Sequence, residues 1–145
     1  MVKKYLNEYN EVFDPFSGYS GRMLGVCSSE KKYIGQDINK VVVDEANQIK
    51  NYFNLDAELF NRDSISDSGN YECLFTCSPY ALKENWNAPL ENKTCDEWID
   101  ICLNNYKCNK YLFIVDNTEK YKENIAEEIQ NKSHFNSNKE YIILI

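Results

Sequence analysis

Short apolar runs alternate with amphipathic stretches along almost the whole chain, and this rhythm restricts the fold more than any other feature. Apolar, β-rich runs occupy residues 11–15, 32–36, 57–60, 71–76, 110–115, 133–135 and 140–145. Helical spacing occupies residues 22–29, 39–53, 95–106 and 119–130, with Asn39 as a helix N-cap. Strands that alternate with helices form βαβ units around a mostly parallel sheet. The sequence therefore predicts an α/β, doubly wound sheet of about seven strands.

The last two predicted strands are separated only by a predicted turn at residues 136–139. A linker of this length can only make a hairpin, so the final strand is expected to be antiparallel. The chain has 145 residues, which is typical of one domain, and we expect residues 1–145 to form it.

The balance of charge restricts the partners of the chain. Asp and Glu number 23 against 16 Lys and Arg, so the formal net charge is −7. Because a domain that grips phosphates is normally basic, either this chain does not bind nucleic acid tightly alone or a partner supplies the cations. The sequence contains no apolar run of membrane-spanning length and no secretory leader at its start. We therefore expect no membrane association and a cytoplasmic location.

Six cysteines are present, none in CxxC spacing, together with a single histidine. This pattern does not match the usual zinc sites, so we expect no metal. Without a leader, reduced and mostly buried thiols are the favoured interpretation.

Three features fall at the ends of predicted strands, where doubly wound sheets bind their ligands. The first is the glycine-containing turn at residues 14–21, DPFSGYSG, and the second is Asp37, whose carboxylate could accept two ribose hydroxyls. The third is the segment TCSPY at residues 76–80. Each also has a plain structural interpretation: a tight strand–helix turn, a carboxylate at a helix start, and a strand-ending turn with a packed tyrosine.

Taken together, the three features resemble the class I S-adenosylmethionine-dependent methyltransferases, and among them the DNA amino-methyltransferases of phage and bacterial modification systems. DPFSGYSGRMLG is similar to their cofactor-binding motif, YIGQDIN to the acidic second motif, and RDS at residues 62–64 to the third. LFTCSPY is similar to the catalytic motif, and LFIVDN at residues 112–117 resembles a later strand of the same Rossmann-like sheet. The resemblance extends over nearly the whole chain from about residue 12.

The resemblance implies S-adenosyl-L-methionine as the cofactor and a role for each matching residue. Asp14, Phe16 and Gly18 would line the methionine part, Asp37 would hold the ribose hydroxyls, and Ile38 would pack on the adenine. Asp63 would accept a hydrogen bond from the adenine amino group, with Ser64 beside it in the third motif. The catalytic segment of the family implies that Cys77, Ser78, Pro79 and Tyr80 hold the target base, with the tyrosine stacked on a base flipped out of the duplex.

Two positions depart from the family pattern. Ser20 replaces the usual second glycine of the first motif, and Cys77 replaces the usual Asp, Asn or Ser acceptor of the catalytic motif. Because a thiol is a weak acceptor, we expect activity to be reduced or absent, or the choice of target to differ. In an alternative alignment with the catalytic motif, shifted by one residue, Ser78 would be the acceptor.

Members of the family carry a separate target-recognition region, for which we find no candidate stretch. We therefore expect a catalytic core that reaches DNA through a further region or a partner subunit. The favoured function is methylation of a DNA base, adenine ahead of cytosine. The alternatives are methylation of an RNA base or a protein amide, and a cofactor- or partner-binding module without catalysis.

Overall fold

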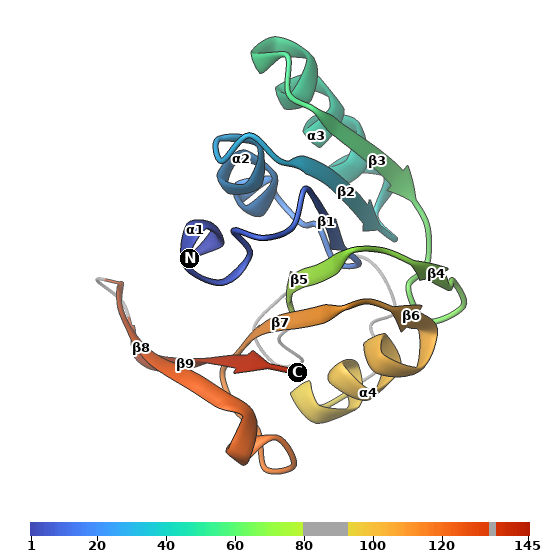
Figure 1. Cartoon of the computed structure of the whole chain (residues 1–145). Helices are drawn as coiled ribbons and strands as arrows, with labels where there is room; N and C mark the ends of the chain where they lie inside the picture. Colours follow the sequence, from blue (N-terminus) through green and yellow to red (C-terminus); the bar gives the residue numbers. More distant parts are fainter. Residues whose placement is uncertain (80–92, 134–135) are drawn as a thin grey trace.

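The computed structural model describes residues 1–79, 93–133 and 136–145, and it contains a central seven-stranded sheet (Figure 1). The strand order is β3-β2-β1-β5-β7-β9-β8. The strands are β1 (Glu11–Asp14), β2 (Lys32–Asp37), β3 (Ala57–Asn61), β5 (Cys73–Cys77), β7 (Lys110–Val115), β8 (Ile125–Ser133) and β9 (Asn136–Leu144). A separate parallel pair consists of β4 (Gly69–Asn70) and β6 (Tyr106–Lys107). The helices are α1 (Val2–Tyr5), α2 (Gly21–Cys27), α3 (Lys40–Phe53) and α4 (Cys95–Asn105), with a 3-10 turn η1 (Lys122–Asn124).

The predicted fold class is confirmed. Strands β1, β2, β3, β5 and β7 pair in parallel, whereas β9 is antiparallel to both β7 and β8. From β1 the chain first builds outward through β2 and β3, and then continues on the other side of β1 with β5 and β7. The order of the strands therefore reverses between β1 and β5, where a sheet of this kind binds its ligands.

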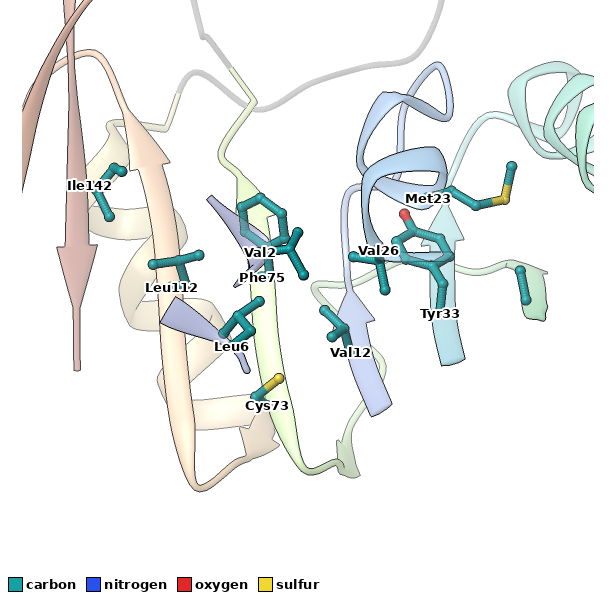
Figure 2. Packing of buried hydrophobic residues seen from close by; sticks show 11 residues of the cluster. Val2, Leu6, Val12, Met23, Val26, Tyr33, Cys73, Phe75, Leu112 and Ile142 are labelled. Carbon is teal, nitrogen blue, oxygen red and sulfur yellow. The ribbon is translucent and has the colours of Figure 1, made fainter. Parts of the chain in front are cut away.

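Alternating side chains place one apolar cluster on each face of the sheet. Val12, Phe75 and Leu112 face the first cluster, which α1 and α2 cover (Figure 2). Phe13 and Phe113, their neighbours in the strands, face the second cluster, which α4 covers. Burial on both faces explains why these strands read as continuous apolar runs in the sequence.

The start of α3 agrees with the sequence-based expectation. The side chain of Asn39 accepts a hydrogen bond from the Val41 N–H, so it caps the helix as predicted. The helix ends at Phe53, and the C-cap residue Asn54 adopts the left-handed conformation with φ of 51°. This arrangement leads the chain directly into β3.

The predicted helix at residues 119–130 is wrong. The segment forms η1 and then the long strand β8, which pairs with β9 over nearly its whole length. A bulge between Ile125 and Glu127 shifts the register, and Ile125 and Ile129 consequently pack on opposite faces of the sheet. Two isoleucines four residues apart suggest one helical face, but the partner strand decides otherwise.

The predicted C-terminal hairpin is antiparallel as expected, but its bounds differ. Residues 136–139, predicted as a turn, belong to β9, which pairs with the end of β8. Residues 134 and 135 of the predicted strand at 133–135 lie outside the described residues. The short helix α1 was not predicted; its Val2 and the following Leu6 are buried in the first cluster.

Candidate functional site

The carboxyl end of β1 carries a fully buried carboxylate, Asp14. Arg22 Nε donates to its Oδ2 at 2.6 Å, and the Tyr33 hydroxyl donates to the same oxygen at 2.7 Å. The Thr76 hydroxyl donates to Oδ1 at 2.7 Å, and the Phe16 N–H donates to it at 3.2 Å. Asp14 therefore connects the carboxyl ends of β1 and β5 to the Tyr33 side chain of β2 and to the start of α2.

The glycine-containing turn after β1 is held by backbone contacts with β2. Gly18 has φ of +51°, a conformation that favours glycine, and its N–H donates to Asp37 Oδ2 at 3.1 Å. The Ser17 N–H donates to the Gln36 carbonyl at 2.9 Å. Ser20, at the position of the usual second glycine, adopts φ of 68° and is the N-cap of α2 without a side-chain capping bond. The turn therefore uses the left-handed conformation at both positions.

Asp37 lies at the carboxyl end of β2, directly against this turn. Its Oδ1 accepts the Asn39 N–H at 2.9 Å, so each carboxylate oxygen receives one backbone N–H. Asn61 Nδ2 donates to the carbonyls of Asp37 and Ile38 at 3.0 and 2.9 Å, and this fixes the segment to the end of β3. Ile38 is 49% exposed, so an apolar side chain is available next to the carboxylate. Contact of Asp37 with a ribose and of Ile38 with an adenine stays a prediction.

Residues 63 and 64 follow β3, and the structure gives them different environments. Asp63 Oδ1 accepts the Ile65 N–H at 2.9 Å and so shapes the turn. The buried Ser64 hydroxyl donates to the Pro15 carbonyl and accepts from Gln36 Nε2 at 2.9 Å. Ser64 therefore joins this loop to the turn after β1, and its direct contact with a cofactor stays a prediction.

The predicted catalytic segment follows β5 at the same edge of the sheet. Cys77 is half-buried, Ser78 is buried, and Pro79 is half-buried. Tyr80 lies outside the described residues, so its predicted place facing the cofactor stays a prediction. The structure thus brings the end of β5 next to the end of β1, because the two strands pair in parallel.

The electrostatics of the site follow from burial. Burial opposes the charge on Arg22, but the Asp14 carboxylate and the polar groups of Tyr33 and Cys77 outweigh it and raise its pKa. Burial, together with Asp14, raises the pKa of the Tyr33 hydroxyl well above its usual value. Burial also raises the pKa of Asp37, although the N–H groups of Asn39 and Gly18 partly offset it. The guanidinium and the phenol thus keep their protons across the physiological range.

Arg22, Tyr33 and Thr76 were not among the predicted site residues. Arg22 lies inside the glycine-containing motif, eight residues after Asp14, and this was the one signal available. Tyr33 and Thr76 look like ordinary strand residues, since nothing local shows that their hydroxyls meet at Asp14.

The six cysteines are free thiols, and Cys73 and Cys102 are buried in the core. Burial raises the pKa of Cys73 and of Cys108 to about 12, which keeps both thiols protonated and unreactive. A search of the described residues for three or more His, Cys, Asp or Glu side chains grouped as metal ligands finds none. In the same residues, we find no helix with the length and apolar character needed to cross a membrane.

Comparisons with known proteins place this geometry in a fold family. No protein-family model matches the sequence, and no curated protein sequence matches it either. Among solved structures, PH1948 of Pyrococcus horikoshii, assigned as an RNA methyltransferase, superposes with a TM-score of 0.72 at 12% identity, over 99% of this chain and 79% of its own. The E. coli protein yhhF, assigned as a methyltransferase, superposes with a TM-score of 0.69 at 12% identity. The superposition covers 99% of this chain and 82% of yhhF. M. capricolum TrmK, solved with S-adenosyl-homocysteine, superposes with a TM-score of 0.69 at 14% identity. The superposition covers 99% of this chain and 65% of TrmK. The chain therefore has the Rossmann-like fold of the class I methyltransferases.

Proposed function

We propose that the chain binds S-adenosyl-L-methionine at the carboxyl edge of β1 and β2 and transfers its methyl group to an exocyclic amino group of a nucleic-acid base. The observation that carries this proposal is the Gly18 N–H contact to Asp37 at the carboxyl ends of β1 and β2, next to the reversal of strand order between β1 and β5. In this fold a glycine turn and a carboxylate after the next strand are the parts that receive a nucleoside. TrmK, a structural neighbour, was solved with the product of this cofactor.

The residues present fit such a cofactor. The Asp37 oxygens each accept one backbone N–H and keep lone pairs for ribose hydroxyls, while the exposed Ile38 offers an apolar surface for the adenine. Gly18 has no side chain, so a ligand can approach its backbone closely, and its positive φ suits glycine. Asp14 acts differently, because its buried carboxylate already accepts five hydrogen bonds from four residues and so holds the turn in shape.

The main contribution of the protein to the proposed methyl transfer is to position the two reacting groups. The cofactor supplies an electrophilic methyl group, so the chain needs only to align an amino nitrogen with it and exclude water. Cys77 and the Ser78 carbonyl are the proposed contacts of that amino group. A thiol is a weak acceptor, so we expect slower turnover than a carboxylate or amide at position 77 would support.

DNA is the proposed substrate, with adenine ahead of cytosine. The net charge of −7 opposes binding to phosphates, so we propose that a further region or a basic partner subunit brings the duplex to the site. The same geometry also supports an RNA base as the substrate. The observation that favours this second candidate is the resemblance in fold to PH1948.

A transfer assay with cofactor labelled at the methyl group tests the proposal. The chain is incubated with duplex DNA, single-stranded DNA and total cellular RNA, and label in nucleic acid is counted. Label in DNA supports the first candidate, and label in RNA alone supports the second. Asp37→Ala should strongly reduce transfer at low cofactor concentration, whereas Asp44→Ala, which removes an exposed carboxylate paired with Lys40, should not. Absence of label in every substrate, combined with absence of cofactor binding by calorimetry, would disprove the proposal.

A further inference from the structure

A chain of three hydrogen-bonded side chains lies directly beside the predicted catalytic segment. The Ser78 hydroxyl donates to Cys95 Sγ at 3.4 Å, and the Cys95 thiol donates to Asp116 Oδ1 at 3.2 Å. Ser78 follows β5, Cys95 is the first residue of α4, and Asp116 follows β7. The three side chains therefore connect three elements at the carboxyl edge of the sheet.

Ser78 is only 2% exposed, and a buried hydroxyl needs a hydrogen-bond partner. Its partner is a thiol, which is a weak acceptor by itself, but the carboxylate behind it accepts the thiol proton. Burial raises the pKa of Cys95 and the bond to Asp116 adds to this, so the thiol stays protonated and remains a donor. Each donor thus points towards Asp116, which favours one rotamer of Ser78.

Within the described residues, the backbone N–H of Ser78 has one weak attachment to a neighbouring strand. Pro79 restricts the residue before it to extended conformations, but it does not place that residue relative to β7. The Ser78 N–H makes a long bond of 3.4 Å to the Ile114 carbonyl, which is a weak attachment. The bond from Ser78 to Cys95 adds an attachment to α4, and the bond from Cys95 to Asp116 extends it to the end of β7.

We infer that Cys95 and Asp116 are positioning residues for the catalytic segment. They hold Ser78 in place and, through it, the Cys77 side chain and the Ser78 carbonyl that are proposed to meet the substrate amino group. The effect on turnover rests on the proposed function, whereas the anchoring of Ser78 can be measured in the protein alone.

Amide hydrogen exchange at Ser78 tests the anchoring without substrate. Cys95→Ala and Asp116→Ala should each raise the exchange rate at Ser78 at least tenfold, and Cys95→Ser, which keeps a donor and an acceptor, should leave it within about threefold. Cys27→Ala is the matched control, because Cys27 is also a half-buried thiol, with Sγ 3.5 Å from the Asp56 carbonyl, and it lies at the end of α2. An exchange rate at Ser78 that Cys95→Ala does not change overturns the inference.

Measurement of kcat for methyl transfer tests whether the anchoring of Ser78 matters for catalysis. Cys95→Ala should lower kcat about 10- to 100-fold, as expected when a reacting group is misplaced by about an ångström, with cofactor affinity unchanged within twofold. Ser78→Pro would fix the backbone by its ring, so in that background Cys95→Ala should change kcat by less than about twofold. If the wild type transfers methyl groups and Cys95→Ala does not lower kcat, the positioning role is wrong. If the wild type is inactive on DNA and RNA while exchange responds as expected, the proposed function fails and the anchoring of Ser78 stands.

Discussion

At the scale of single residues, the site depends on carboxylates that differ in their environment. Asp14 is fully buried and accepts five hydrogen bonds from four residues, whereas Asp37 is half-buried and accepts only two backbone N–H groups among the described contacts. The first therefore holds the structure of the site, and the second is available to a ligand.

Removing Arg22 should destabilise the fold strongly. Arg22→Ala leaves the buried Asp14 carboxylate without its cation, which typically costs about 3–5 kcal/mol. The free energy of unfolding in urea measures the loss. Arg62→Ala is the matched control, because Arg62 is half-exposed and 3.8 Å from Asp67, and it should cost less than about 1 kcal/mol. Equal losses in both variants would contradict the structural role of the Asp14 network.

Cofactor affinity should depend on the charge of Asp37. Asp37→Ala should weaken binding by about 1.5–3 kcal/mol, the usual contribution of a hydrogen bond to a charged group. Burial raises the pKa of Asp37, so affinity in the wild type should fall as the pH falls through that raised pKa, while Asp37→Asn should lose this dependence. The same protonation stabilises the fold, since the folded protein binds this proton more tightly than the unfolded chain, so stability and affinity respond in opposite directions. Calorimetric titration with S-adenosyl-homocysteine across this range measures the effect, and a pH-independent affinity in the wild type would remove Asp37 from the site.

At the scale of elements, the turn between β1 and α2 is strained at one residue. Ser20 has φ of 68°, which costs a residue with a Cβ about 1–2 kcal/mol, and its side chain makes no capping bond in return. At α4, in contrast, Thr94 and Glu97 form a capping box, in which the side chain of each residue accepts a hydrogen bond from the backbone N–H of the other.

Ser20→Gly should therefore stabilise the protein by about 1 kcal/mol, because glycine adopts a positive φ without strain. Thermal unfolding should show a higher Tm in this variant. Asn54→Gly is the matched control: Asn54 also has a positive φ, of 51°, but asparagine tolerates this conformation better, so the gain should be smaller. A lower Tm for Ser20→Gly would mean that the serine side chain contributes more than the strain costs.

At the scale of the whole molecule, the charge predicts weak binding to nucleic acid. With a net charge of −7, the chain alone should bind duplex DNA with a Kd above about 1 μM near physiological salt, in the range of non-specific binders or weaker. Fluorescence anisotropy with a labelled duplex at several salt concentrations measures this. Submicromolar binding at physiological salt would show that the chain carries its own nucleic-acid surface and would remove the need for a basic partner.

The sequence by itself determined the α/β class of the fold, its mostly parallel sheet and the antiparallel C-terminal end. Strand β7 has the predicted bounds, and Asn39 caps α3 as predicted, because apolar spacing and capping are local properties. The glycine turn and Asp37 meet as expected, since the carboxyl ends of neighbouring parallel strands lie at one edge of the sheet.

Only the tertiary structure decided what depends on distant partners. Residues 125–129 have helical spacing, yet they form β8 because β9 pairs with them, and pairing across the sheet outweighs local preference. Thr76 lies 62 residues from Asp14 in the chain but donates to its carboxylate, and Cys95 meets Asp116 across 21 residues. Such contacts leave no periodic signal in the sequence, because each side chain meets its partner only after the strands have been placed side by side.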